Sequence, residues 1–179
     1  LTPPAAETAR RDAPTGLIVG ALLLVMLLSA LDQTIVSTAL PTIVGELGGL
    51  DQLSWVVTAY LLSSTVVLPL YGKLGDLYGR KVVLQAAIVL FLAGSALCGV
   101  AQDMTQLIVL RALQGLGGGG LMVVTMAAIG DLVPPDRRAR YQGMFGGVYG
   151  LATIIGPLLG GFLVEHLSWR WIFTINLPL

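Results

Sequence analysis

The sequence has little charge, a single cysteine and a single histidine, and these shortages exclude several classes of protein. Charged residues make up 11% of the 179 residues, against about 25% in a typical soluble domain. With Cys98 alone the chain has no internal disulfide framework, and with His166 alone it lacks a ligand set for zinc. The formal net charge is zero, so we expect no polyanionic partner such as a nucleic acid.

Long apolar stretches are what the sequence has in abundance. Hydrophobic residues make up 55% of the chain and the mean hydropathy is +0.85, too high for a soluble core of this size. A helix rises about 1.5 Å per residue and the hydrocarbon core is about 30 Å thick, so about 20 apolar residues cross a bilayer. We therefore expect an all-α polytopic membrane protein. Its five expected transmembrane helices are Thr15–Leu40, Leu53–Tyr71, Val82–Gln102, Thr105–Gly130 and Tyr141–Val164.

The two ends of the chain differ from this pattern. Residues 1–14 are polar and contain prolines, and we expect them to form a disordered cytoplasmic tail. The apolar run that follows continues past Asp32 to Leu40, which is too long for a signal peptide, so we expect a retained span. A sixth span begins at Trp169 and the sequence then stops. We expect residues 15–179 to be an incomplete transmembrane bundle, completed by further C-terminal spans; a short re-entrant segment is the alternative.

Basic residues gather in alternate loops, and this distribution predicts the orientation of the chain. Eight of the ten lysines and arginines lie in the tail or in the loops after the second and fourth spans. Arg170 lies on the opposite side, and Arg111 lies within a span. Because cytoplasmic loops carry the excess of basic residues, we expect a cytoplasmic N-terminus.

Two ionisable residues, Asp32 and Arg111, lie inside predicted spans. A charge at the centre of a membrane helix costs about 2.5–3.5 kcal/mol, so each should face the bundle interior or water. At helical rise, Asp32 lies about 12 Å from the outer end of its span and Arg111 about 9 Å from the outer start of its own. Opposite charges at similar depth can pair, and separating them changes the proton affinity of the acid. We expect Asp32 to pair and to exchange a proton; the alternative is an outer-leaflet charge that reaches the interface.

Glycine is frequent, with 23 residues, and it clusters in the fourth and fifth spans. Small residues four positions apart let membrane helices approach closely, and Gly143–Gly147, Gly146–Gly150 and Gly156–Gly160 have this spacing. Pro157 removes one backbone hydrogen bond and predicts a kink in the fifth span. The run Gly117–Gly120 has no lysine-serine ending and no preceding strand, so it is not a phosphate-binding loop, and we expect no cofactor.

The charged segment Gly72–Lys81, with the sequence GKLGDLYGRK, joins two uncharged stretches. It resembles the loop between spans two and three of the major facilitator superfamily, whose signature is G-x-L-x-D-[RK]-x-G-R-[KR]. Leu77 departs from the signature, because a basic residue is common there. Arg111 and Gln114, in the stretch LIVLRALQGLGGG, are similar to the span-four signature of the same superfamily.

Three further stretches resemble the drug:proton antiporters of this superfamily that have fourteen spans. Residues 152–161, ATIIGPLLGG, are similar to the antiporter signature of span five, with Ala152 in place of a glycine. The residues that match it are Gly156, Pro157, Gly160 and Gly161. Residues 31–36, LDQTIV, are similar to the span-one signature, and residues 169–173, WRWIF, to the approach to span six. The resemblance implies a multidrug efflux protein of which this chain is the N-terminal part.

The resemblance also implies roles for individual residues. Such folds consist of three-helix repeats around a substrate cavity near the midplane, so Asp32, Arg111 and Gln114 are expected at the cavity and in proton coupling. The residues expected to form a cytoplasmic gate are Gly72, Asp76, Gly79, Arg80, Lys81 and Asp131. The resemblance implies that Asp76 and Arg80 lock the inner ends of the helices in one state of the transport cycle. Asp131 is the expected partner of Arg80, because a bidentate pair of an arginine and a carboxylate can act as a latch. The alternative is that the loop charges serve orientation alone.

A second correspondence suggests a latch on the outer side. Glu165 and Arg170 follow Gly161 at a spacing similar to that of Asp76 and Arg80 in the charged segment. The loop between spans five and six occupies the symmetry-equivalent place in the repeat. We therefore expect Glu165 and Arg170 to form an outer gate.

Together these features favour a proton-coupled secondary transporter that exports drugs or other amphipathic small molecules by alternating access. An acid in an apolar cavity suits a lipophilic substrate, in particular a cation, with protons as the coupling ions and membrane lipid as the surroundings. A bacterial cell membrane is the expected location. The alternatives are an importer of a nutrient such as a sugar, or a piece that transports nothing by itself. Because His166 lies outside the spans, no catalytic constellation is evident and we expect no enzyme.

Overall fold

The structure is a computed structural model that describes residues 9–177, with side chains from residue 16 onward. Within this range the helices are α1 (Ala9–Leu47), α2 (Leu53–Tyr78), α3 (Arg80–Gly99), α4 (Met104–Leu132), α5 (Arg138–His166) and the short α6 (Trp171–Thr174). Two 3-10 turns, η1 (Leu50–Gln52) and η2 (Pro135–Arg137), precede α2 and α5. The five long helices are long and apolar enough to cross a membrane. The expected all-α fold with five membrane-spanning helices is confirmed.

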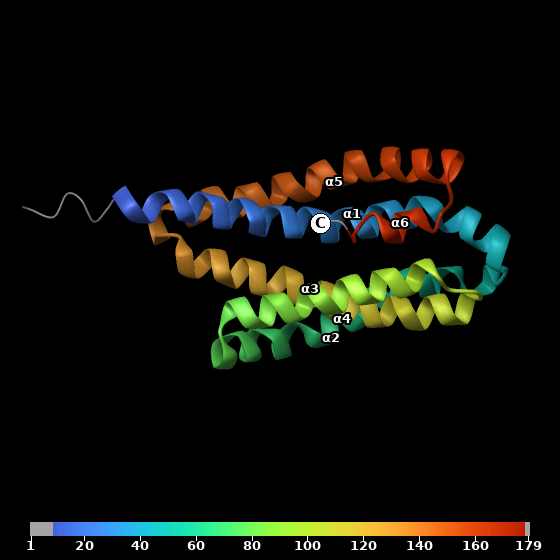
Figure 1. The fold of residues 1–179 in the computed structure, drawn as a ribbon, viewed down its shortest axis with the longest axis horizontal. Coiled ribbons are helices and arrows are strands. Elements are labelled where there is room, and N and C mark those ends of the chain that lie inside the picture. The colour runs from blue at the N-terminus through green and yellow to red at the C-terminus, as the bar shows by residue number, and fades with distance from the viewer. Residues whose placement is uncertain (1–8, 178–179) are drawn as a thin grey trace, which may run out of the picture.

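The helices form two groups that pack along their length (Figure 1). Helix α4 packs against both α2 and α3, while α1 packs against α5, and a contact between α1 and α4 joins the two groups. The short α6, near the red end of the colour scale, lies against α3 and α1. One cluster of buried apolar side chains includes Trp169, Ile172 and Phe173. The start of the predicted sixth span is therefore part of the packed core.

Helix α1 extends beyond the predicted first span in both directions. It begins at Ala9 rather than Thr15 and ends at Leu47 rather than Leu40. Hydropathy marks the hydrocarbon region only, whereas a helix continues past it for as long as the backbone hydrogen bonds are made. The predicted tail, residues 1–14, lies mostly outside the described residues and stays a prediction.

The charged segment Gly72–Lys81 is helical except for one residue. Helix α2 continues to Tyr78, α3 begins at Arg80, and Gly79 alone separates them. Gly79 has a φ of +88°, a backbone conformation that residues with a Cβ atom rarely adopt. A single glycine therefore makes the turn, and it brings the charges at the end of α2 beside those at the start of α3.

The glycine run of α4 lets two other helices approach its backbone. A Cβ atom at Gly115 would clash with the backbone carbonyl of Tyr60 in α2. On another face, a Cβ atom at Gly117 would clash with the backbone amide of Phe91 in α3. These contacts explain why α2, α3 and α4 form one tightly packed group, since packing rather than hydrophobicity drives helix association in a membrane.

The glycine packing predicted for α5 occurs in only one of three places. Gly156 and Gly160 pack against α1. Cβ atoms placed on the pairs Gly143–Gly147 and Gly146–Gly150 meet no atom within 4 Å, and the same holds for Gly161. The expected close packing at these two pairs is therefore not found among the described residues. Their spacing is the same, but they face away from the neighbouring helices.

Gly117→Ala should destabilise the bundle, because the new methyl group would meet the backbone of α3 at Phe91. Overpacking of this kind costs about 1–3 kcal/mol, which thermal unfolding of the purified full-length protein would detect as a lower melting temperature. Gly130→Ala in the same helix is the control, because a Cβ atom there meets no atom within 4 Å. Equal melting temperatures for the two variants would contradict the close approach of α3 and α4.

Candidate functional site

Asp32 on α1 and Arg111 on α4 meet inside the bundle. The Nη1 atom of Arg111 lies 2.7 Å from Oδ2 of Asp32, and the side chains of Arg111 and Asp32 are 1% and 0% exposed. Removing two charges from water costs several kcal/mol per ion, so a buried pair by itself is weak evidence for stability. Ionisable groups within membrane spans usually mark substrate or ion pathways. The pair is therefore the centre of the candidate site.

The Asp32 carboxylate accepts hydrogen bonds from three side chains. Besides Arg111, the Nε2 atom of Gln114 donates to Oδ1 at 2.9 Å, and Nδ2 of Asn176 donates to the same oxygen at 2.9 Å. Gln114 also accepts a hydrogen bond from Arg111 through Oε1 at 2.7 Å, which sets the orientation of its amide. All three partners donate, and an ionised carboxylate only accepts. The arrangement therefore surrounds the Asp32 carboxylate with three donors.

Arg111 is also enclosed by aromatic rings. Its guanidinium carbon lies 4.3 Å from the centroid of the Tyr60 ring and 5.8 Å from that of Phe173, distances at which cation–π attraction acts. Among the described residues its Nε atom has no hydrogen-bond partner. Arg111 thus keeps one buried N–H group without a partner among the described residues.

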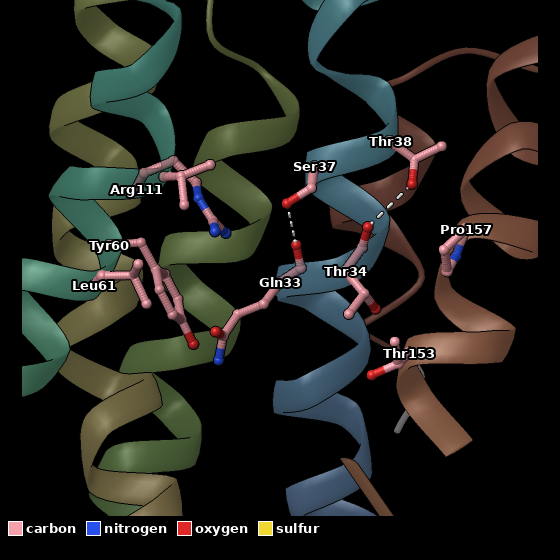
Figure 2. Close-up of a pocket in the computed structure, with 10 residues that line it drawn as sticks. Gln33, Thr34, Ser37, Thr38, Tyr60, Leu61, Arg111, Thr153 and Pro157 are labelled. Carbon is pink, nitrogen blue, oxygen red and sulfur yellow. Dashed lines mark hydrogen bonds between the residues drawn. The ribbon is translucent and has the colours of Figure 1, made fainter. Parts of the chain in front are cut away.

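A cavity of about 450 Å³ lies beside the pair (Figure 2), within the range of about 300–1,000 Å³ typical of small-molecule sites. The residues that line it are Gln33, Thr34, Ser37, Thr38, Val57, Tyr60, Leu61, Arg111, Thr153 and Pro157. Figure 2 shows Gln33 and Ser37 turned toward α2 and α4, and Thr34 and Thr38 toward α5. The lining combines hydroxyl and amide groups with apolar surface. Of the charged pair, only Arg111 reaches the cavity.

The antiporter-like segment of α5 packs on α1 beside this cavity. The Thr34 hydroxyl lies 3.2 Å from the Ala152 carbonyl on α5, and the one hydrogen of this hydroxyl is shared between that carbonyl and two carbonyls of α1, those of Ala30 and Leu31. A Cβ atom at Gly156 would overlap the Thr34 hydroxyl, so only glycine permits this contact. Pro157 follows directly and lines the cavity. The matched residues thus place α5 against the polar face of α1.

Gly156→Ala should push α5 away from α1, because the added methyl group would occupy the space of the Thr34 hydroxyl. We expect a loss of about 1–3 kcal/mol in the stability of the full-length protein, measured by thermal unfolding. Thr34→Ala removes the clashing hydroxyl, so the double variant should recover part of that loss. If the double variant instead loses as much stability as the two single variants added together, Gly156 and Thr34 do not contact each other.

Arg80 joins two acids at the end of the bundle predicted to be cytoplasmic. Its Nη2 atom lies 2.8 Å from Oδ1 of Asp76, and its Nε atom donates to Oδ2 of Asp131 at 3.1 Å. Gly75 makes room for it, since a Cβ atom there would lie 2.8 Å from Nη1 of Arg80. The two carboxylates are 68% and 63% exposed, and exposed ion pairs contribute about 0–1 kcal/mol. The network is weak enough to form and break.

Two of the predicted gate residues take no part in this network. Within residues 9–177 the structure records no ion pair for Lys81. A Cβ atom at Gly72 would meet nothing within 4 Å. Gly79 contributes through its turn, which brings Arg80 next to Asp76.

The structure does not bring Glu165 and Arg170 together. Nη1 of Arg170 donates to the carbonyls of Gly99 at 3.0 Å and Ala101 at 2.7 Å, and the guanidinium lies over the Trp169 ring. For Glu165, which is exposed, no ion pair is recorded between residues 9 and 177. The last carbonyls of a helix lack partners and attract cations, so Arg170 caps α3 instead. The predicted outer latch is not formed in this structure.

Three buried polar residues of the site were not among those predicted from the sequence. They are Tyr60, Ser95 and Asn176, with exposed fractions of 1%, 0% and 2%. Each lies in an otherwise apolar stretch, the same pattern that identified Asp32. Neutral polar side chains are common in membrane helices, however, and their partners become evident only in three dimensions.

Residues 22–179 match the family model of the Major Facilitator Superfamily. The chain is 53% identical over 162 residues to the multidrug transporter protein MdtP of Bacillus subtilis, which covers 90% of this chain and 30% of that protein. It is 47% identical over 172 residues to multidrug resistance protein 3 of the same species, covering 96% and 34%. With efflux pump FUS6 of Gibberella moniliformis the identity is 40% over 176 residues, covering 98% and 31%. The chain thus spans about a third of the length of these curated relatives.

A solved structure, the inward open conformation of the xylose transporter XylE from E. coli, matches with a TM-score of 0.73 at 18% identity. The match covers 92% of this chain and 45% of that one, and at such identity it concerns the fold alone. The relatives come from bacteria and fungi, so a bacterial origin stays a prediction. Five apolar helices, their arrangement and the match over residues 22–179 agree: this chain is a membrane protein that belongs to the Major Facilitator Superfamily.

Proposed function

We propose that this chain is part of a proton-coupled transporter that exports amphipathic small molecules, with Asp32 as the proton-binding group. The observation that carries the proposal is the buried pair of Asp32 and Arg111 beside a cavity. Of the two groups only the carboxylate can exchange a proton during transport, because a guanidinium stays charged. The names of the relatives, two multidrug proteins and an efflux pump, support export of drugs over import of a nutrient.

Proton binding at Asp32 would weaken the pair. In the observed arrangement three side chains donate hydrogen bonds to the carboxylate. A proton on Asp32 cancels the attraction for Arg111, and the guanidinium is then free to turn toward the cavity that it already lines. Two arrangements of the same buried groups, each favoured by one protonation state, are what alternating access needs.

The lining of the cavity supports an amphipathic substrate. Val57, Leu61 and Pro157 supply apolar surface, while Gln33 and Ser37 supply hydrogen-bonding groups. The Asp32–Arg111 pair is neutral overall, so a lipophilic cation gains attraction only after Arg111 has left an ionised Asp32. A cationic substrate and a proton would then compete for one carboxylate, which links their movements in opposite directions.

We also propose that the contacts of Arg80 with Asp76 and Asp131 form the cytoplasmic latch of the transport cycle. Weak, partly exposed pairs that join α2, α3 and α4 suit a contact that opens in each cycle. The proposed location is the cell membrane with a cytoplasmic N-terminus. It is supported by the eight basic residues on one side of the chain. The outer latch of Glu165 and Arg170 stays a prediction.

Reconstitution of the full-length transporter in proteoliposomes tests the proposed function. With an acidic vesicle interior, the wild type should accumulate the fluorescent cation ethidium, and a protonophore should abolish this accumulation. Uptake that does not depend on the proton gradient would contradict proton-coupled export. Uptake of a radiolabelled neutral sugar driven by the opposite gradient, with an acidic exterior, would favour the importer.

A further inference from the structure

Asn176 lies just after α6 and contacts Asp32, the proposed proton-binding group. Its Nδ2 atom donates to Oδ1 of Asp32 and to the hydroxyl of Ser95, both at 2.9 Å. The Ser95 hydroxyl in turn donates to the carbonyl of Phe173 at 2.8 Å. A hydroxyl has only one hydrogen, so toward Asn176 it must accept. The orientation of the Asn176 amide is therefore set by the chain of bonds itself.

This chain of bonds cannot persist when Asp32 carries a proton on Oδ1, the oxygen that Asn176 contacts. Both amide hydrogens of Asn176 are used, one on Asp32 and one on Ser95. A protonated carboxyl group carries a hydrogen that needs an acceptor. Asn176 can accept it only after its amide turns over and presents Oδ1. Ser95 must then turn its own hydrogen from the Phe173 carbonyl to Asn176.

The segment that carries Asn176 is held firmly at its other end. Nε1 of Trp169, a buried residue, donates to Oε2 of Glu46 on α1 at 2.7 Å, and Arg170 caps the end of α3. The hydrogen bond between Ser95 and Phe173 ties the segment to α3 next to Asp32. Loss of that bond on protonation would release the segment on the side of Asn176 while its outer end stays anchored.

We propose that Asn176 is a positioning residue for proton coupling, which holds Asp32 ionised and, through Ser95, transmits its protonation to the start of the sixth span. The inference rests on the proposed function, in which Asp32 binds the proton. The other titratable groups that face Asp32 are Arg111 on α4, Tyr60 on α2 and Cys98 on α3. None of them is altered by a change at Asn176.

The first part of the proposal, that Asn176 holds Asp32 ionised, is tested by labelling Asp32 in the full-length protein. The reagent is dicyclohexylcarbodiimide, which reacts with protonated carboxyl groups in apolar surroundings. Mass spectrometry of the labelled peptide gives the pH of half-maximal labelling. Asn176→Leu removes a donor that stabilises the charged form more than the neutral form, so this pH should rise by about one unit. Asn176→Asp has the same shape but places a second carboxylate beside Asp32, so the rise should be larger.

The matched control is Thr174→Val, because the Thr174 hydroxyl donates to the carbonyl of Arg170 and does not contact Asp32. In this variant the pH of half-maximal labelling of Asp32 should equal that of the wild type. An unchanged pH of half-maximal labelling in Asn176→Leu overturns the proposal. Labelling of Asp32 that does not vary with pH in the wild type also overturns it. If Asp32 titrates as described but transport ignores the proton gradient, the proposed function fails, and only the part of the inference in which Asn176 holds Asp32 ionised remains.

The second part of the proposal, transmission of the protonation through Ser95, is tested by the accessibility of Leu177, the residue that follows Asn176. In a Cys98→Ala background, Leu177→Cys gives a single site for a maleimide. Its labelling rate should change across the pH range in which Asp32 titrates. Adding Ser95→Ala should remove this pH dependence, because the bond to Phe173 is then absent in both states. A pH dependence that persists after Ser95→Ala would contradict transmission through Ser95.

Discussion

Arg111→Leu should lower the free energy of unfolding of the full-length transporter by about 3–5 kcal/mol at pH 8, because it leaves the Asp32 carboxylate buried without its cation. The variant also loses the stacking of the guanidinium on the Tyr60 ring. The loss should be smaller at pH 5.5, since an unpaired acid in an apolar site is more easily neutralised by a proton. Thermal unfolding of the purified protein at both pH values measures the effect.

The double variant Arg111→Leu with Asp32→Asn is the control for this prediction. It removes both charges, and a buried pair replaced as a whole by neutral groups is often tolerated. The double variant should therefore be more stable than Arg111→Leu alone at pH 8, and its stability should not depend on this pH range. A double variant as unstable as the single one would show that Arg111 stabilises the bundle through packing and not through Asp32.

Asp32→Asn should reduce proton-driven export by about 10- to 100-fold, the size of a typical coupling between two binding sites. An amide has the shape of a carboxyl group but cannot take up a proton in this pH range, so the cavity and the substrate contacts persist. Transport into proteoliposomes with and without a proton gradient separates proton coupling from substrate transport. Gradient-driven uptake of ethidium should be lost, whereas exchange of ethidium across the membrane without a gradient should remain within a few-fold of the wild type.

The matched control makes the same substitution outside the site. Asp51 lies in η1, outside the helices that carry the site, and is exposed. Asp51→Asn should leave gradient-driven uptake unchanged. Undiminished uptake in Asp32→Asn would contradict the coupling role of Asp32, and an equal loss in both variants would point to a general effect of removing a carboxylate.

The span locations and the two central residues could be predicted from the sequence because both depend on local physical quantities. An apolar run long enough for a bilayer identifies a span, and a charge within such a run, as at Asp32 and Arg111, is too unfavourable to go unpaired. The similar depths of these two residues predicted that they could meet, and the structure places them 2.7 Å apart. The role of the pair stays a proposal.

The remaining features depend on which helix faces which, and local spacing does not contain that information. The pair Gly146–Gly150 has the same spacing as Gly156–Gly160, but only the latter faces α1. Arg170 was predicted to pair with Glu165, whereas the free carbonyls at the end of α3 hold its guanidinium. In the same way, an asparagine in an apolar stretch gives no sign of its partner until α6 is placed beside α1 and α3.

The most direct test of coupling at Asp32 measures the protons released when substrate binds to the full-length transporter. The measurement uses a pH-indicator dye in weakly buffered detergent solution. If proton and substrate both bind at Asp32, saturating ethidium should release protons from the wild type near the pH at which Asp32 is half protonated. Asp32→Asn should bind ethidium and release none. Equal proton release from the wild type and Asp32→Asn would contradict the claim that Asp32 couples the two.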